Sequence, residues 1–134
     1  MTTRVSARGE TLREAFAGTA LAVLGLAVEP GALEEREVRE VRAHGETAEA
    51  LFASWINECL YVHEVEGFAC RRIDFAVFDA APRAGAEPMR LHSFLHGEEI
   101  APDRHRPRVS LETVSPRAVS VQAVGDGYEV SVDV

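Results

Sequence analysis

Two histidines, His92 and His96, are the first residues whose type and spacing suggest chemistry. A separation of four residues lets two histidines chelate one ion on a helix, where such positions are neighbours. The surrounding segment, MRLHSFL, is instead predicted to be a strand. Four residues of a strand span about 13 Å, at about 3.3 Å per residue. One ion cannot bridge that distance, so we do not expect a metal site at this pair.

Covalent catalysis has little support in this chain. All 14 basic residues are Arg, which excludes a lysine nucleophile or a Schiff base. Cys59 falls on an apolar helical face and Cys70 in a predicted strand, with no CxxC pair, so both are interpreted as small buried hydrophobes. No Ser/His/Asp or Cys/His set has a sequence context that suggests a nucleophile, and no P-loop or GxGxxG motif occurs. We therefore do not expect an enzyme, and scattered His and carboxylates give a small metal-dependent hydrolase little support.

The charge balance bears on possible partners. The formal net charge is −8, and tight nucleic-acid binding needs Lys and Arg to displace counterions from phosphates. Trp55 and Tyr61 are accordingly predicted to pack in the core and at a helix end rather than to stack on bases. The acidic run from Glu34 to Glu40 is interrupted by Arg36 and Arg39, which is typical of a solvated face. Alternatively, it steers the protein to a basic partner.

Length and composition bound the class of protein. The 134 residues, 46% of them apolar and 27% charged, predict a single globular domain over residues 1–134. The longest apolar stretch, Ala15–Val28, is shorter than the roughly 20 residues that cross a bilayer. No targeting segment is visible, so we expect a cytoplasmic protein.

An internal sequence repeat indicates how the chain is built. Residues 5–24 (VSARGETLREAFAGTALAVL) recur as residues 41–60 (VRAHGETAEALFASWINECL). Each copy predicts a strand, a glycine turn and a helix that a Glu-Thr pair begins. The apolar spacing predicts the buried helix faces, which are Leu12, Phe16, Thr19, Ala20, Val23 and Leu24 in the first copy and Leu51, Phe52, Trp55, Ile56, Cys59 and Leu60 in the second. Two β-turn-α units are therefore expected side by side.

The rest of the chain is predicted to be strands. Glu29-Pro30-Gly31 is expected to end the first helix and Glu66-Gly67 the second. Alternation after Gly67 predicts a half-buried strand with Ile73, Phe75 and Val77 inward. Further strands are predicted at Met89–Leu95, Val109–Val114, Val119–Val124 and Tyr128–Val134, with a loop over 80–88, an irregular stretch over 101–107 and a Gly125-Asp126-Gly127 hairpin. Helices followed by a run of antiparallel strands indicate an α+β fold, with the helices packed on the sheet.

Five segments in this order resemble the archease family. They are RGETLREAF (8–16), SWINECLY (54–61), EGF (66–68), APDRHRP (101–107) and a final strand ending in Asp-Val. The SWINECLY segment matches the family's W-[LI]-N-E-x-L-Y helix. The resemblance implies the archease fold and a protein that is not itself an enzyme. It implies instead a cofactor that stimulates an RtcB-type tRNA-splicing ligase, in tRNA splicing or RNA repair, by promoting its guanylylation and turnover.

The resemblance also implies a divalent metal site. Archeases combine an Asp near the N-terminus, the penultimate Asp and the last residue, so Asp133 and the carboxylate of Val134 are the expected ligands here. Such oxygen ligands suit Ca²⁺ or Mg²⁺, although two carboxylates make a partial site. Asp103 and His105 resemble the family's loop residues and are expected to contact the partner; alternatively, they form a solvated turn.

Two departures from the family pattern bear on activity. The family's His-Thr-Ala-Asp motif falls with its Asp on Thr2, and a family Lys is replaced by Glu112. A mis-assigned start would explain Thr2 alone, whereas divergence would explain both. The alternative to ligase activation is therefore an archease-fold binding module that has lost both the metal site and the activation. Oligomeric state, the physiological metal, the RNA substrate and the effect of Glu112 are left open by the sequence.

Overall fold

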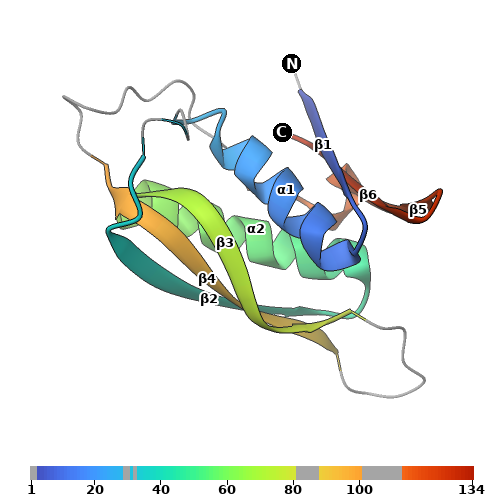
Figure 1. Cartoon of the computed structure of the whole chain (residues 1–134). Coiled ribbons are helices and arrows are strands. Elements are labelled where there is room, and N and C mark those ends of the chain that lie inside the picture. Colours follow the sequence, from blue (N-terminus) through green and yellow to red (C-terminus); the bar gives the residue numbers. More distant parts are fainter. Residues whose placement is uncertain (1–2, 29–30, 32, 81–87, 101–112) are drawn as a thin grey trace.

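A computed structural model describes residues 3–28, 31, 33–80, 88–100 and 113–134. It contains two helices and two antiparallel sheets (Figure 1). The elements, in chain order, are β1 (Arg4–Gly9), α1 (Leu12–Leu24), β2 (Glu37–Gly45), α2 (Ala48–Val65), β3 (Phe68–Asp79), β4 (Met89–Glu99), the short 3-10 turn η2 (Pro116–Ala118), β5 (Val119–Val124) and β6 (Gly127–Asp133). The predicted α+β class is confirmed.

The two β-turn-α units share local structure but lie in different sheets. One sheet has the order β1-β6-β5 and the other β2-β4-β3. Each helix contacts strands of both sheets, so the helices lie between them (Figure 1). The threonines that begin the helices of the two repeats have the same role. Thr11 accepts a hydrogen bond from the Glu14 N–H, and Thr47 accepts one from Ala50, which satisfies N–H groups that the first helical turn leaves free.

An aromatic cluster joins the two helices to β3. Phe16 of α1 lies edge-on to Phe52 of α2, with ring centroids 5.1 Å apart, and edge-on to Phe78 of β3, at 5.0 Å. Trp55 is fully buried and lies 5.3 Å from Phe75. Edge-to-face contacts at such distances stabilise aromatic pairs beyond the area that they bury. The predicted inward faces of both helices are confirmed, except that Leu12 is only partly buried. The structure also buries four residues that were not predicted, which are Ala15 in α1 and Ala53, Val62 and His63 in α2.

Two predicted helix ends differ in outcome. The first helix ends at Leu24, before the Glu29-Pro30-Gly31 stop, and the N–H groups of Leu26 and Ala27 bond three residues back instead of four. This tightening ends the α-helix one turn early. The second helix ends at Val65 with Glu66 as its C-cap, and Gly67 follows with φ at +64°, a conformation that glycine adopts readily. The prediction for Glu66-Gly67 is confirmed.

The predicted alternation in β3 breaks at a bulge. The register shifts between Phe75 and Val77, so that Val77 pairs with His92, and Phe78 pairs with Leu91. Val77 is consequently 40% exposed, whereas it was predicted to point inward. A bulge inserts one residue into the pairing and moves the following side chains to the opposite faces.

The remaining strands follow the predictions at most positions. β5 has the predicted bounds, the Gly125-Asp126-Gly127 hairpin is confirmed, and β4 extends the predicted strand to Glu99. The predicted loop over 80–88 falls mostly, and the irregular stretch over 101–107 entirely, outside the described residues. So does most of the predicted strand Val109–Val114, whose described end belongs to no strand. No helix among the described residues is long and apolar enough to cross a membrane.

Candidate functional site

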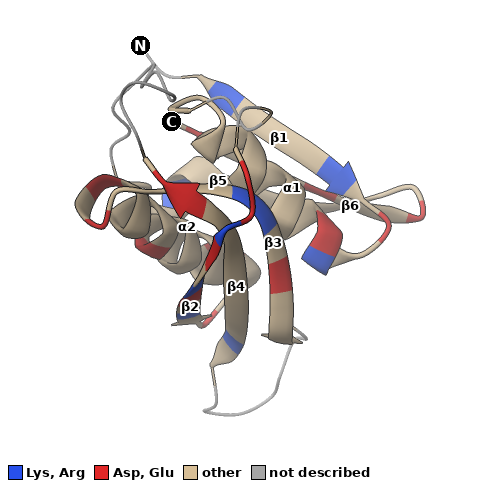
Figure 2. Cartoon of the chain, turned by 60° about the vertical axis from the view of Figure 1, so that its left-hand side comes forward, with Lys and Arg blue, Asp and Glu red and all other residues tan. Residues whose placement is uncertain are grey.

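One end of the first sheet brings the two ends of the chain together, because its edge strand β1 pairs with its central strand β6. Strands β1 and β6 pair from Arg4 opposite Asp133 to Gly9 opposite Tyr128. Beyond the strands, Thr3 and Val134 exchange two main-chain hydrogen bonds, of 2.7 and 2.8 Å. Basic bands on β1 therefore lie beside acidic bands on β6 (Figure 2).

Asp133, one of the two predicted metal ligands, is held by Arg4. The Arg4 Nε donates to Asp133 Oδ1 at 3.1 Å and its Nη2 to Oδ2 at 3.4 Å. Val132, the preceding residue, is fully buried, so alternation along the strand places Asp133 on the face away from the helices. Its neighbour Val134 packs its side chain against the core. The carboxylate of Asp133 also raises the pKa of Arg4, through the hydrogen bonds first and charge second.

The residues at this end of the sheet fit a divalent cation poorly. Both oxygens of Asp133 accept bonds from Arg4, and the main-chain oxygen of Val134 accepts the Thr3 N–H. Ca²⁺ needs six to eight oxygen ligands, and a guanidinium beside the site repels a second positive charge. Among the described residues, no group of three or more His, Cys, Asp or Glu side chains is placed to hold a metal. A cation on Asp133 and Val134 stays a prediction, and it would require Arg4 to move away.

The histidine pair lies on β4, where the sequence predicted a strand. His96 Nε2 lies 2.8 Å from Asp74 Oδ2, and His92 Nε2 lies 3.3 Å from Glu40 Oε2. The second distance is within range for an ion pair, but the angles do not make it a hydrogen bond. Each histidine thus lies beside a different carboxylate on the outer face of the second sheet.

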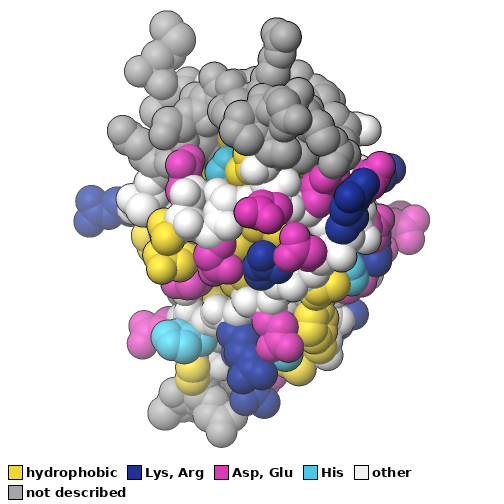
Figure 3. Space-filling model, turned by 90° about the vertical axis from the view of Figure 1, so that its left-hand side faces the viewer, with side chains coloured by type: hydrophobic (Ala, Val, Ile, Leu, Met, Phe, Trp, Pro, Cys, Tyr) yellow, Lys and Arg dark blue, Asp and Glu magenta, His cyan; other side chains and the backbone are white. Residues whose placement is uncertain are grey.

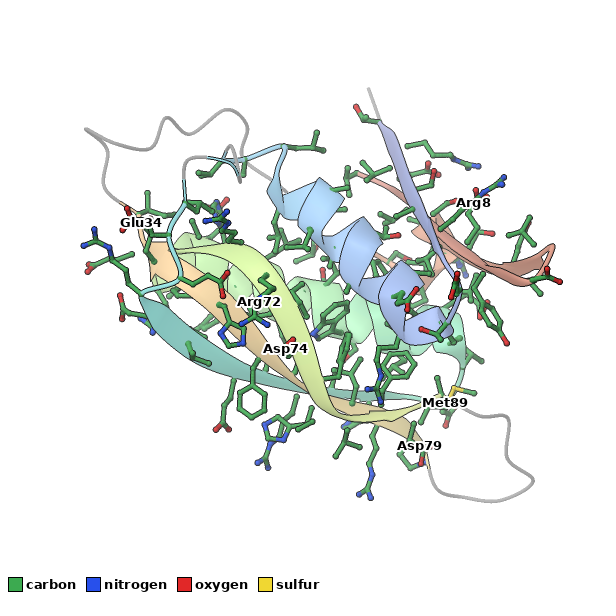
Figure 4. All side chains as sticks on the ribbon, in the orientation of Figure 1. Arg8, Glu34, Arg72, Asp74, Asp79 and Met89 are labelled. Carbon is green, nitrogen blue, oxygen red and sulfur yellow. The ribbon has the colours of Figure 1, made fainter. Side chains whose placement is uncertain are left out.

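Ion pairs cover this outer region of the second sheet. Arg72 bonds both Glu35 and Asp74, and its guanidinium is the first cause of a lowered pKa at Asp74. Figure 4 shows Arg72 and Asp74 beside each other on β3. Acidic and basic side chains alternate over one face of the molecule (Figure 3). The acidic run around Glu34 is therefore part of a charged surface, as predicted.

The strongest sequence motif, SWINECLY, divides into buried and exposed residues on α2. Trp55 is buried and its Nε1 donates to Ser93 Oγ at 2.9 Å. Asn57 clamps the main chain of Val114: its Nδ2 donates to the Val114 carbonyl at 2.8 Å, and its Oδ1 accepts the Val114 N–H at 2.6 Å. Glu58 is exposed and Tyr61 is 54% exposed. The predicted core position of Trp55 is confirmed, whereas the predicted packing of Tyr61 is wrong.

The described residues on either side of 101–112 are both tied to the region of α2. Ile100 donates its N–H to the carbonyl of Gly67, just beyond the end of α2, at 2.6 Å. Val114 is held by Asn57, in the middle of the same helix. Asp103, His105 and Glu112 lie outside the described residues, as does Thr2, so their expected roles stay predictions.

The two cysteines are buried and unpaired, as predicted. Cys59 lies in α2 and Cys70 in β3. Burial raises the pKa of the Cys70 thiol to about 12 and that of Cys59 well above its usual value. Both are therefore protonated near neutral pH and are poor nucleophiles.

Sequence reasoning missed Arg4 and Asn57. Arg4 could have been found by pairing the first strand with the last, since an arginine at one end would then face the penultimate aspartate. Asn57 carries a weaker signal, because a polar residue beside a buried helical face can equally be solvated. Its partner is main chain more than fifty residues away, at Val114, and no sequence pattern identifies such a partner.

Comparison with known proteins gives one consistent family. The model of the archease protein family matches residues 3–134. The protein archease of Pyrococcus abyssi is 30% identical over 119 residues, covering 89% of this chain and 80% of that protein. The archease-like protein of Drosophila melanogaster is 23% identical over 127 residues, covering 92% and 78%.

Two solved structures share the fold. A solution structure of a Methanobacterium thermoautotrophicum protein matches with a TM-score of 0.77 at 22% identity, covering 99% of this chain and 91% of that one. The crystal structure of a Thermotoga maritima archease, described as a possible chaperone, matches with a TM-score of 0.53 at 15% identity, covering 98% and 87%.

Proposed function

This chain belongs to the archease family, and on that basis we propose that it is a protein cofactor of an RtcB-type RNA ligase. It binds the ligase, promotes its guanylylation and supports repeated turnover in tRNA splicing or RNA repair. The single observation that carries the proposal is the family match along nearly the whole chain, residues 3–134. A cytoplasmic location is part of the same proposal.

The surface chemistry supports a protein partner over direct RNA binding. The 22 acidic side chains outnumber the 14 arginines that could neutralise phosphates, and the net charge is −8. A ligase that holds RNA needs a positively charged surface, which would attract an acidic helper electrostatically. In this proposal the ligase holds the RNA and this protein acts on the ligase.

The exposed part of the SWINECLY motif is the surface that we assign to the ligase. Packing and hydrogen bonding account for Trp55 and Asn57, whereas Glu58 and Tyr61 face outward on the same helix. Tyrosine is enriched at protein interfaces because its ring is apolar and its hydroxyl polar. Asp103 and His105 extend this contact in the proposal.

The deciding experiment measures guanylylation of the cognate RNA ligase with and without this protein, at single and multiple turnover. We expect clear stimulation, weakened by Tyr61→Ala and Glu58→Lys. Glu46→Lys, a change at an exposed position just before α2, is the matched control and keeps full stimulation. A folded wild-type protein that neither binds the ligase nor accelerates it overturns the proposal.

A second candidate function is a binding module that acts independently of the ligase. Thr2 and Glu112 favour it, because each replaces a residue of the family pattern. Absence of stimulation together with a correctly folded chain selects this candidate. The predicted cation bears on both candidates, and its binding is measured separately.

A further inference from the structure

The arginine beside the predicted metal ligands has a consequence for how the protein depends on ions. We propose that Arg4 takes the place of a divalent cation at Asp133, so that this edge of the protein carries a built-in positive charge and does not bind Ca²⁺ or Mg²⁺. The inference concerns the isolated chain, and it holds or fails independently of the ligase.

Hydrogen bonding at Asp133 is the first support. Its two oxygens accept bonds from the Arg4 Nε and Nη2, at 3.1 and 3.4 Å. A guanidinium presents paired donors that match the two oxygens of a carboxylate. It neutralises the same negative charge that a bound cation would neutralise, and it does so without a ligand from solution.

Strand register is the second support, because it fixes this pair in place. Arg4 is opposite Asp133 in the β1–β6 ladder, and the Thr3–Val134 hydrogen bonds continue the pairing past both residues. Cross-strand partners on one face have Cβ atoms about 5 Å apart, so the guanidinium starts within reach of the carboxylate. The backbone thus holds Arg4 at the place where a cation would have to enter.

The chain contains a matched comparison for this pair. Arg8 and Glu129 are opposite each other on the same two strands, with Arg8 Nε 2.9 Å from Glu129 Oε2. Both arginines are mostly exposed, at 70% for Arg4 and 72% for Arg8. Only Arg4 lies beside the expected ligands, so removal of each arginine separates an effect of position from a general effect of charge.

The test is calorimetric titration of the purified protein with Ca²⁺ and with Mg²⁺. We expect no measurable binding by the wild type and measurable binding by both Arg4→Ala and Arg4→Gln. The gain is at least about tenfold over the weakest affinity that the titration detects, which corresponds to about 1.4 kcal/mol. Arg8→Ala remains like the wild type. Adding Asp133→Asn to Arg4→Ala removes the gain.

Three outcomes overturn the inference. They are wild-type binding as tight as that of Arg4→Ala, no gain in either Arg4 variant, and an equal gain in Arg8→Ala. Circular dichroism at each titration point confirms that the variants are folded. Because the titration contains no ligase, a failed ligase assay leaves its result unchanged, and the two proposals are judged separately.

Discussion

The side chain of Asn57 holds a distant part of the backbone with two hydrogen bonds. It makes both available hydrogen bonds to the main chain of Val114, which is itself 6% exposed. A buried main-chain group that loses its partner costs about 1–3 kcal/mol. This single amide therefore fixes the position of Val114, two residues before η2.

We predict that Asn57→Ala lowers the free energy of unfolding by about 1–3 kcal/mol. Urea denaturation followed by circular dichroism measures the change, and hydrogen exchange at the Val114 amide shows whether the local bond is lost. Glu64→Gln, an exposed change in the same helix, stays within about 0.5 kcal/mol of wild type. An unchanged exchange rate at Val114 would contradict the assigned role of Asn57.

His63 gives the stability a dependence on pH. It lies in the last turn of α2, and burial lowers its pKa from 6.5. The folded protein therefore favours the neutral ring, whereas the unfolded chain takes up a proton near pH 6.5. The contribution of the neutral His63 ring to the free energy of unfolding is fully present above pH 6.5. It is lost as the pH falls from there toward the lowered pKa of the folded protein.

We predict that His63→Gln weakens this loss. Urea midpoints at several pH values between neutral and mildly acidic measure the stability of both proteins. The wild type should lose more stability on acidification than the variant, because the variant has no ring to protonate at this position. Equal losses in the two proteins would show that other groups set the pH dependence.

The sequence predicted the candidate site at the level of single residues only in part. Trp55, Cys59 and Cys70 were placed in the core because apolar periodicity determines which helix and strand positions face inward. Tyr61 was misplaced because an aromatic ring at a helix end satisfies the same pattern whether it is covered or exposed. The Arg4–Asp133 pair depends on register between the first and last strands, which local patterns do not specify.

At the level of elements, the glycines at equivalent positions of the two repeats, Gly9 and Gly45, let each strand approach its own helix closely. A Cβ on Gly9 would lie 2.7 Å from the Ala15 nitrogen, and one on Gly45 would lie 2.5 Å from the Leu51 nitrogen. Each strand thus passes directly against the first turns of its own helix. A side chain at either position would push the helix away from its strand.

We predict that Gly9→Ala and Gly45→Ala each destabilise the protein by about 1–3 kcal/mol, the usual cost of overpacking. Thermal and urea denaturation provide the measurement. Gly31→Ala is the control, since a Cβ there meets nothing within 4 Å, and we expect it to leave the free energy of unfolding nearly unchanged. Equal effects at the three positions would refute the steric explanation.

The element order was largely predictable, and the exceptions have physical causes. Helix α2 and strand β5 follow strong periodicity and clear end signals. The bulge after Phe75 was not predicted, because Ala76 fits an alternating strand as well as a bulge. Assignment of β1 and β2 to separate sheets depends on pairing with β6 and β4, and such long-range pairing is not encoded in the local pattern.

On the scale of the whole molecule, the net charge of −8 argues against direct RNA binding. We predict that it does not retard a single-stranded or a tRNA-like RNA in gel electrophoresis at moderate salt, because a chain with a net charge of −8 repels phosphates. The ligase alone is the positive control. Retardation by this protein that weakens as salt rises would contradict the prediction and would move RNA binding from the ligase to this chain.

The single tryptophan in this chain also makes its core visible to spectroscopy. Trp55 is fully buried, is surrounded by phenylalanines from α1, α2 and β3, and donates its indole N–H to Ser93. An indole in such a dry environment emits at shorter wavelength than one in water. The intrinsic fluorescence of the unlabelled protein therefore reports on the contact of both helices with β3. A shift of the emission to longer wavelength shows that solvent has reached Trp55.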